Sequence, residues 1–148
     1  MGLFKNLFKT DTKNQVDYYR EGLELLNVGK YHEALTSFRL ALRETPRDTA
    51  VLQQMAITYT RIGMTDEAIK TYRGVLDVDA GVPGAHYGLA FLLLRDGRNS
   101  EALEHLKAFL DHPPQGPEAR RHIDHARQTL AELQNDAGGS SAHVTDAP

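Results

Sequence analysis

Three short stretches decide the fold of this 148-residue chain: GKYHEAL at 29–35, GMTDEAI at 63–69 and GRNSEAL at 97–103. Their glycines lie 34 residues apart, and the Glu-Ala pair inside each stretch keeps the same spacing. Several columns in register across three copies indicate an internal repeat, which is the sequence signature of a stacked repeat protein. Each 34-residue unit is therefore expected to fold in the same way.

Each unit predicts a pair of helices. In the first unit, apolar residues at helical spacing lie on both sides of Gly29, with Leu25 and Leu26 before it and Leu35 and Phe38 after it. Glycine adopts the left-handed conformation at a helix end with little strain, so Gly29 is expected to separate the two helices.

Further residues predict where helices begin. Thr65 and Asn99 are plausible N-caps for the second helices of units two and three, and Asp48 for the helix that begins near residue 49. Pro83 and Pro117 suit first-turn positions, where no backbone N–H is needed.

Small residues recur in two columns, which predicts close crossings between helices because a bulky side chain there would push them apart. The two columns are Gly22, Ala56 and Ala90, and Ala34, Ala68 and Ala102. A third column, made of Phe38, Tyr72 and Leu106, is expected to fill the space beside them.

These columns resemble the tetratricopeptide repeat, whose pattern runs from an aromatic or large residue through Gly, Ala and Tyr positions to a final Pro. The matches are Tyr18, Gly22, Ala34, Phe38, Ala41 and Pro46 in the first unit, Leu52, Ala56, Tyr59, Ala68, Tyr72 and Val75 in the second, and Leu89, Ala90, Leu93, Ala102, Leu106 and Pro114 in the third. The pattern departs at Leu25, where Tyr is usual, at Ala80, where Pro is usual, at His86, and at Phe109, where Ala is typical. The resemblance implies an all-α solenoid, a right-handed superhelix of three helix hairpins.

The last repeat needs a cap with one polar face. Apolar residues recur there at steps of four and three: Ala119, Ile123, Ala126, Leu130 and Leu133. The chain after residue 134 is small, polar and rich in glycine, so it is expected to be disordered. The expected organisation is an amphipathic segment at 1–14, repeats at 15–48, 49–82 and 83–116, a capping helix at 117–134 and a tail at 135–148.

The amphipathic segment MGLFKNLFK places four apolar side chains on one side of a helical wheel: Leu3, Phe4, Leu7 and Phe8. Three roles are open for this segment. It covers the first repeat, it binds weakly to an anionic membrane surface, or it packs in the groove of its own or another protomer. The last two roles define an alternative function, a self-assembling or membrane-peripheral scaffold.

In the tetratricopeptide family, the first helix of each repeat lines a concave groove, so the resemblance implies which side chains meet a partner. These positions are Tyr19, Leu23, Leu26 and Asn27, then Gln53, Ile57, Thr60 and Arg61, then Tyr87, Phe91, Leu94 and Arg95. Seven of the twelve are apolar or aromatic, and we expect them to form an exposed patch of the kind that marks interaction sites.

A well-known variant of this groove binds a terminal carboxylate through Lys and Asn in the first repeat and Lys and Arg in the third. Those positions are here Tyr19, Leu23, Gly84 and Gly88, so that clamp is absent. The groove instead favours a protein partner that presents an amphipathic helix or an extended apolar segment. Arg61 and Arg95 are placed to hold one acidic side chain at the groove rim.

Composition narrows the function further. Without cysteine there are no disulfides, thiolate metal sites or cysteine nucleophiles, and a net charge of −3 argues against a nucleic-acid partner. Catalytic and phosphate-binding motifs are not found, and the histidines, including His122 and His125, are expected to be surface imidazoles and not metal ligands. No signal peptide or membrane-spanning stretch is expected. We therefore expect a cytoplasmic, non-enzymatic adaptor without metal or cofactor.

Overall fold

The computed structural model describes residues 16–144, with side chains described up to residue 139. This part of the chain contains helices and no strands: α2 (Tyr18–Asn27), α3 (Tyr31–Glu44), α4 (Thr49–Ile62), α5 (Thr65–Val78), α6 (Pro83–Arg95), α7 (Asn99–Asp111) and α8 (Pro117–Val144). Leu3, Phe4, Leu7 and Phe8 lie outside the described residues, so the roles expected for them stay predictions.

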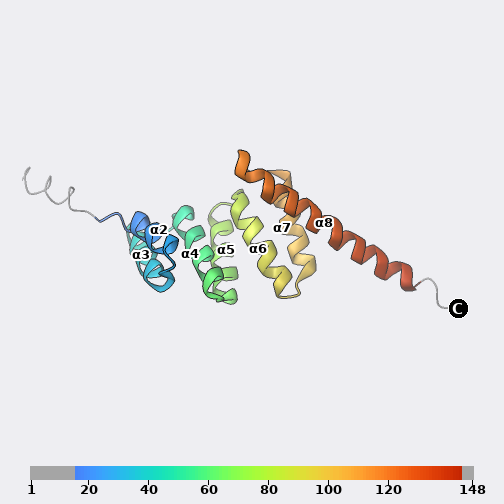
Figure 1. Cartoon of the computed structure of the whole chain (residues 1–148), viewed down its shortest axis with the longest axis horizontal. Helices are drawn as coiled ribbons and strands as arrows, with labels where there is room; N and C mark the ends of the chain where they lie inside the picture. The colour runs from blue at the N-terminus through green and yellow to red at the C-terminus, as the bar shows by residue number, and fades with distance from the viewer. Residues whose placement is uncertain (1–15, 145–148) are drawn as a thin grey trace, which may run out of the picture.

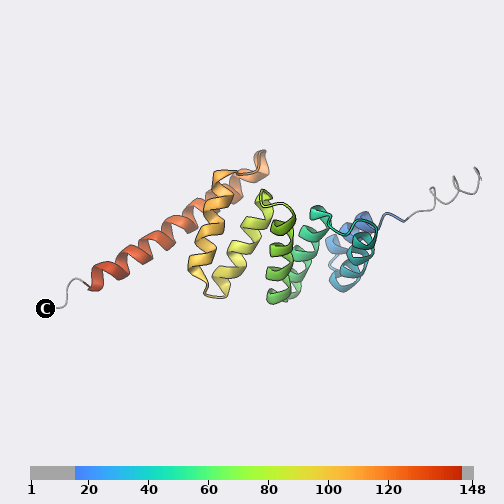
Figure 2. The ribbon, with the colours of Figure 1, turned by 180° about the vertical axis from the view of Figure 1, so that it is seen from behind.

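The helices form three hairpins stacked in chain order (Figures 1 and 2). The pairs α2–α3, α4–α5 and α6–α7 pack within the hairpins, while α3–α4 and α5–α6 pack between them. The first helices also touch one another directly, α2 against α4 and α4 against α6. This arrangement confirms the predicted all-α solenoid, and it places α2, α4 and α6 side by side along one face.

The local signals for the ends of the helices are partly confirmed. Gly29, Gly63 and Gly97 all have positive φ, between 75° and 86°, at the end of a first helix. Asp48 accepts hydrogen bonds from the N–H groups of residues 50 and 51, as an N-cap should. The prediction for Thr65 and Asn99 was wrong by one position. Both are the first helical residues, and the cap positions before them, Met64 and Arg98, make no side-chain cap bond.

The residues of both small-residue columns are buried between the helices. Ala34, Ala68 and Ala102 are fully buried. A Cβ atom built on Gly22 would overlap the ring of Phe38, which explains why that column starts with glycine. The large residues of the third column are buried as well, Phe38 and Tyr72 in one core cluster and Leu106 in a second cluster under the last hairpin.

Helix α8 is longer than expected. It buries Ala119 and Ala126, the face predicted to cover the third repeat, but it continues past residue 134 to Val144. Gly138 and Gly139 do not take the left-handed conformation that ends the first helices, so they do not stop it. Residues 135–144 are thus helical and not an irregular tail, and Figure 1 shows α8 crossing the end of the stack and extending beyond it.

Candidate functional site: a hollow between the first helices

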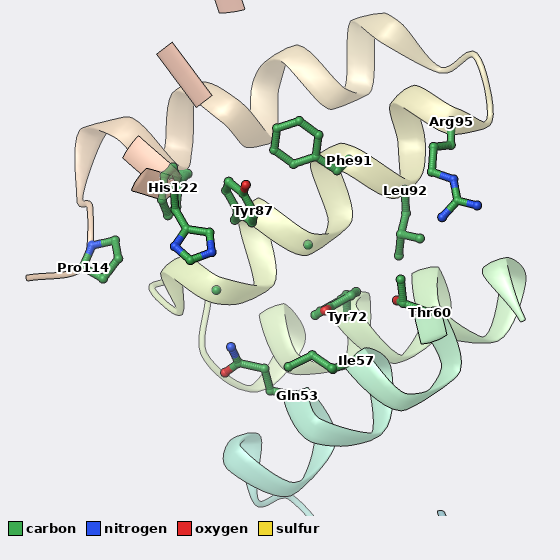
Figure 3. Close-up of a pocket in the computed structure, with 13 residues that line it drawn as sticks. Gln53, Ile57, Thr60, Tyr72, Tyr87, Phe91, Leu92, Arg95, Pro114 and His122 are labelled. Atoms are coloured by element: carbon green, nitrogen blue, oxygen red, sulfur yellow. The ribbon is translucent and has the colours of Figure 1, made fainter. Parts of the chain in front are cut away.

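The groove face carries a hollow of about 430 Å³ between the second and third repeats. We call it the groove hollow and define it by its lining: Gln53, Ile57, Thr60, Tyr72, Gly84, Tyr87, Gly88, Phe91, Leu92, Arg95, Phe109, Pro114 and His122. Figure 3 shows α4 side chains on one side and α6 side chains on the other. Its volume lies within the range of about 300–1,000 Å³ that is typical of binding sites.

Two glycines four residues apart on α6 line this space. A Cβ atom on Gly88 would overlap the ring of Tyr72, and the atoms nearest to one on Gly84 belong to the end of the Gln53 side chain. Gly88 therefore lets α5 and α6 approach closely, whereas Gly84 is bordered by the end of a flexible side chain. These are the positions that carry long side chains in the carboxylate-binding variant of the fold.

Tyr72 gives the hollow a rigid base. Its side chain is only 4% exposed, and burial raises the pKa of its hydroxyl to about 12, an effect reduced by a hydrogen bond with Thr60. Thr60 Oγ1 itself donates to the carbonyl of Ala56 at 2.8 Å. Because the pKa of Tyr72 lies far above 7, its hydroxyl is neutral at neutral pH, and its ring is held in place by burial.

The start of α8 builds the wall at the third repeat. The His125 ring stacks on Phe91 with centroids 4.4 Å apart and planes 8° from parallel, and the Tyr87 hydroxyl is hydrogen-bonded to His125 Nδ1 at 2.8 Å. His122 meets the edge of Tyr87 at 4.9 Å, and Phe109 lies 5.1 Å from the same ring. Both histidines are exposed, as expected, and they also contact the aromatic side chains of this wall.

The formal charge of the lining is positive and lies at one end of the hollow. Arg95 is the one formally charged side chain among the described residues that line the hollow, and it is exposed. Figure 3 places it at the opposite end from Pro114 and His122. The hollow therefore has an apolar centre and a cationic end.

Six of the twelve predicted groove residues line this hollow: Gln53, Ile57, Thr60, Tyr87, Phe91 and Arg95. The other six do not, and they are Tyr19, Leu23, Leu26, Asn27, Arg61 and Leu94. Leu26 is only 8% exposed and belongs to the core, so it offers little surface to a partner. Tyr19, Leu23, Ile57 and Leu94 are half-buried because they also pack against the core.

The predicted groove side chains are therefore less exposed than the sequence analysis expected. Within the described chain, the most exposed large hydrophobic residues are Val16, Val28, Met64 and Val78, and none of them lines the hollow. Sequence reasoning missed Tyr72, Leu92, Phe109, Pro114 and His122 as lining residues. The Gly84–Gly88 pair was visible in the sequence and is the signal that points to a hollow at this place.

Two classes of site are not found in the part of the chain that the structure describes. No three His, Asp or Glu side chains come together as metal ligands there. Among those same residues, no helix combines the length and apolar character needed to span a membrane.

The fold and the groove define a helical-repeat protein of the tetratricopeptide class. A family model described as protein kinase G tetratricopeptide repeat matches residues 3–139, and the chain belongs to this family. The resemblance noted from the repeat columns is thereby confirmed.

The curated relatives include photosystem I assembly proteins called Ycf3. The protein from Parasynechococcus marenigrum (strain WH8102) is 36% identical over 93 residues, which cover 61% of this chain and 54% of the relative. The one from Synechococcus sp. (strain WH7803) is 37% identical over 87 residues, covering 57% and 50%. This chain thus spans about half the length of these relatives.

Solved structures support the fold. The Yersinia enterocolitica type III secretion chaperone SycD, in complex with a peptide of the translocator YopD, has a TM-score of 0.76 at 21% identity, covering 86% of this chain and 95% of that one. PcrH, in complex with the chaperone binding region of PopD, has a TM-score of 0.73 at 17% identity, with coverage of 86% and 95%. At these identities the likeness concerns the fold.

Proposed function

We propose that this chain is a non-enzymatic adaptor that binds an amphipathic helix or an extended apolar segment of a partner protein in the groove. The observation that carries the proposal is the groove hollow, which is lined mainly by apolar and aromatic side chains on the face formed by the first helices. Tyrosine and arginine, represented here by Tyr87 and Arg95, are enriched at the energetic centres of protein interfaces. The SycD and PcrH structures are described as complexes with segments of other proteins, and Ycf3 is named as an assembly protein, which supports the same class of role.

The proposal implies a moderate affinity. A segment that buries about 500 Å² of apolar surface gains ~12 kcal/mol before the costs of association. Lost translational freedom and the ordering of the segment remove a large part of this gain, so the expected dissociation constant is in the micromolar range.

The substitution Gly84→Leu tests the proposal by filling the hollow. The atoms nearest to the added Cβ all belong to the end of Gln53, which can move, so the fold should tolerate the change. Gly74→Leu is the matched control. Gly74 is also helical, lies on α5, and has no heavy atom within 4 Å of an added Cβ.

The experiment compares the proteins that co-purify with tagged wild type and with each variant from cells that produce the protein. The affinity of each purified partner is then measured by calorimetry. We expect Gly84→Leu to weaken binding by about 2 kcal/mol, or roughly 30-fold, and Gly74→Leu to leave it unchanged. Partners that bind Gly84→Leu as tightly as wild type would contradict the proposal.

A further inference from the structure

The cationic end of the groove hollow has no ion-pair partner among the described side chains, residues 16–139. Arg95 lies in the last turn of α6, and no carboxylate of residues 16–139 forms an ion pair with it. Asp96, its neighbour in sequence, does not pair with it either. In contrast, Arg73 on the outer face pairs with Glu101 at 2.7 Å.

Among the described residues, the second repeat also has an arginine without an ion pair at the end of its first helix. Arg61 occupies the equivalent position at the end of α4, is exposed, and also has no ion-pair partner in the described part of the chain. Because α4 and α6 pack directly against each other, both cations lie at the same end of the groove. Neither arginine forms an ion pair within residues 16–139, and exposed cations of this kind favour an anionic group of the partner.

We propose that the partner segment carries two recognition groups: a bulky apolar side chain that enters the groove hollow beside Gly88, and a side-chain carboxylate that pairs with Arg95. This inference rests on the proposed function and names the chemistry of its partner. Arginine is suited to this role because its guanidinium binds a carboxylate through two parallel hydrogen bonds.

The helix geometry fixes the spacing between the two groups. Gly88 and Arg95 are seven residues apart, or two turns of α6, which places them on one face about 10 Å apart at ~1.5 Å per residue. A helical partner spans this distance in about seven residues, and an extended one in about three. The carboxylate therefore lies two helical turns, or three extended residues, from the apolar anchor.

A displayed library of random 12-residue peptides, selected on the purified full-length chain, tests this inference. Enriched peptides are then synthesised with an amidated C-terminus, so that only side-chain carboxylates are present. Their affinities are measured for wild type, Arg95→Glu, Gly84→Leu and the control Arg43→Glu. Arg43 is an exposed arginine in the last turn of α3 that has no ion pair within residues 16–139, so its reversal changes the net charge equally.

We expect enrichment of Asp or Glu at the stated spacing from a large apolar residue. Arg95→Glu should weaken these peptides roughly fivefold or more, whereas Arg43→Glu should have little effect. Peptides with Lys in place of the acidic residue should bind Arg95→Glu better than wild type. Circular dichroism of each variant verifies that the fold is retained.

Three kinds of result would overturn the inference, and each shows which part of it is wrong. Selected peptides without an acidic residue, or equal binding by Arg95→Glu, refute the ion pair, while loss of binding in Gly84→Leu still supports the groove. Peptides that are indifferent to Gly84→Leu refute the proposed function as well. Tighter binding by a full-length variant with Phe4→Glu and Phe8→Glu would make the chain's own N-terminal segment the occupant.

Discussion

The same substitution at two helical glycines should change stability in opposite directions. Gly74 and Gly88 both lie inside helices, α5 and α6, and neither has a positive φ. A Cβ atom on Gly74 has no neighbour within 4 Å, but one on Gly88 overlaps the ring of Tyr72. Tyr72 cannot move aside easily because it is almost fully buried and hydrogen-bonded to Thr60.

The expected magnitudes follow from these surroundings. Alanine in place of a helical glycine stabilises by about 0.5–1 kcal/mol, and this gain applies to both sites. Overpacking against a buried side chain costs about 1–3 kcal/mol and applies to Gly88 alone. The two variants should therefore differ by about 1–3 kcal/mol in the free energy of unfolding, with Gly74→Ala above wild type and Gly88→Ala below it.

Urea unfolding at 25 °C, followed by circular dichroism at 222 nm, measures this difference. In a Tyr72→Leu background the cost of Gly88→Ala should shrink, because the ring that causes the overlap is gone. Equal stability of Gly74→Ala and Gly88→Ala would refute the close α5–α6 packing on which the groove hollow depends.

Three further predictions concern the rest of the chain. Ala68→Phe should lower the free energy of unfolding by about 3 kcal/mol or more, because Ala68 is fully buried at a helix crossing; a neutral result in the same urea assay would contradict the repeat register. Burial and the neighbouring His86, whose Nδ1 lies 3.0 Å from His105 Nδ1, lower the pKa of His105 below its usual value near ~6.5 despite Glu101 and Glu104. The native state therefore disfavours the charged ring of His105, so the melting temperature should fall as pH drops below about 6.5. The substitution His105→Leu should reduce that fall, and equal pH profiles of the two proteins would contradict this prediction. Removal of residues 1–14 should leave the oligomeric state in light scattering unchanged, apart from the mass of the deleted residues, and should cause no loss of liposome binding, since the groove is built from later residues; a change of oligomeric state or a loss of liposome binding would favour the scaffold alternative.

Much of the fold could be predicted from the sequence because each hairpin packs in the same way and so requires similar residues at the same positions of every repeat. The 34-residue period, the glycines that end the first helices and the alanines at helix crossings each have a local physical cause. Thr65 shows the limit of such signals, since a residue suited to an N-cap lies one position inside the helix instead. The length of α8 was also missed, because Gly138 and Gly139 do not act as stop signals there.

The site was only partly predictable for a different reason. The family pattern identifies the side of each first helix that faces the groove, but it does not show which of those side chains the core also covers, as it does Leu26. The wall with His122 and His125 depends on how α8 packs against α7 and so brings both rings to Tyr87 and Phe91 of α6, and that contact lies outside the repeat period.

Site-specific photo-cross-linking tests most directly whether the partner lies in the groove. A benzophenone amino acid replaces either Gln53, which lines the groove hollow, or Lys70, which is exposed on α5. With a bound peptide or partner protein, irradiation should yield a covalent adduct from position 53 and little from position 70. Equal adducts from both positions, or adducts from position 70 alone, would contradict a groove-bound partner.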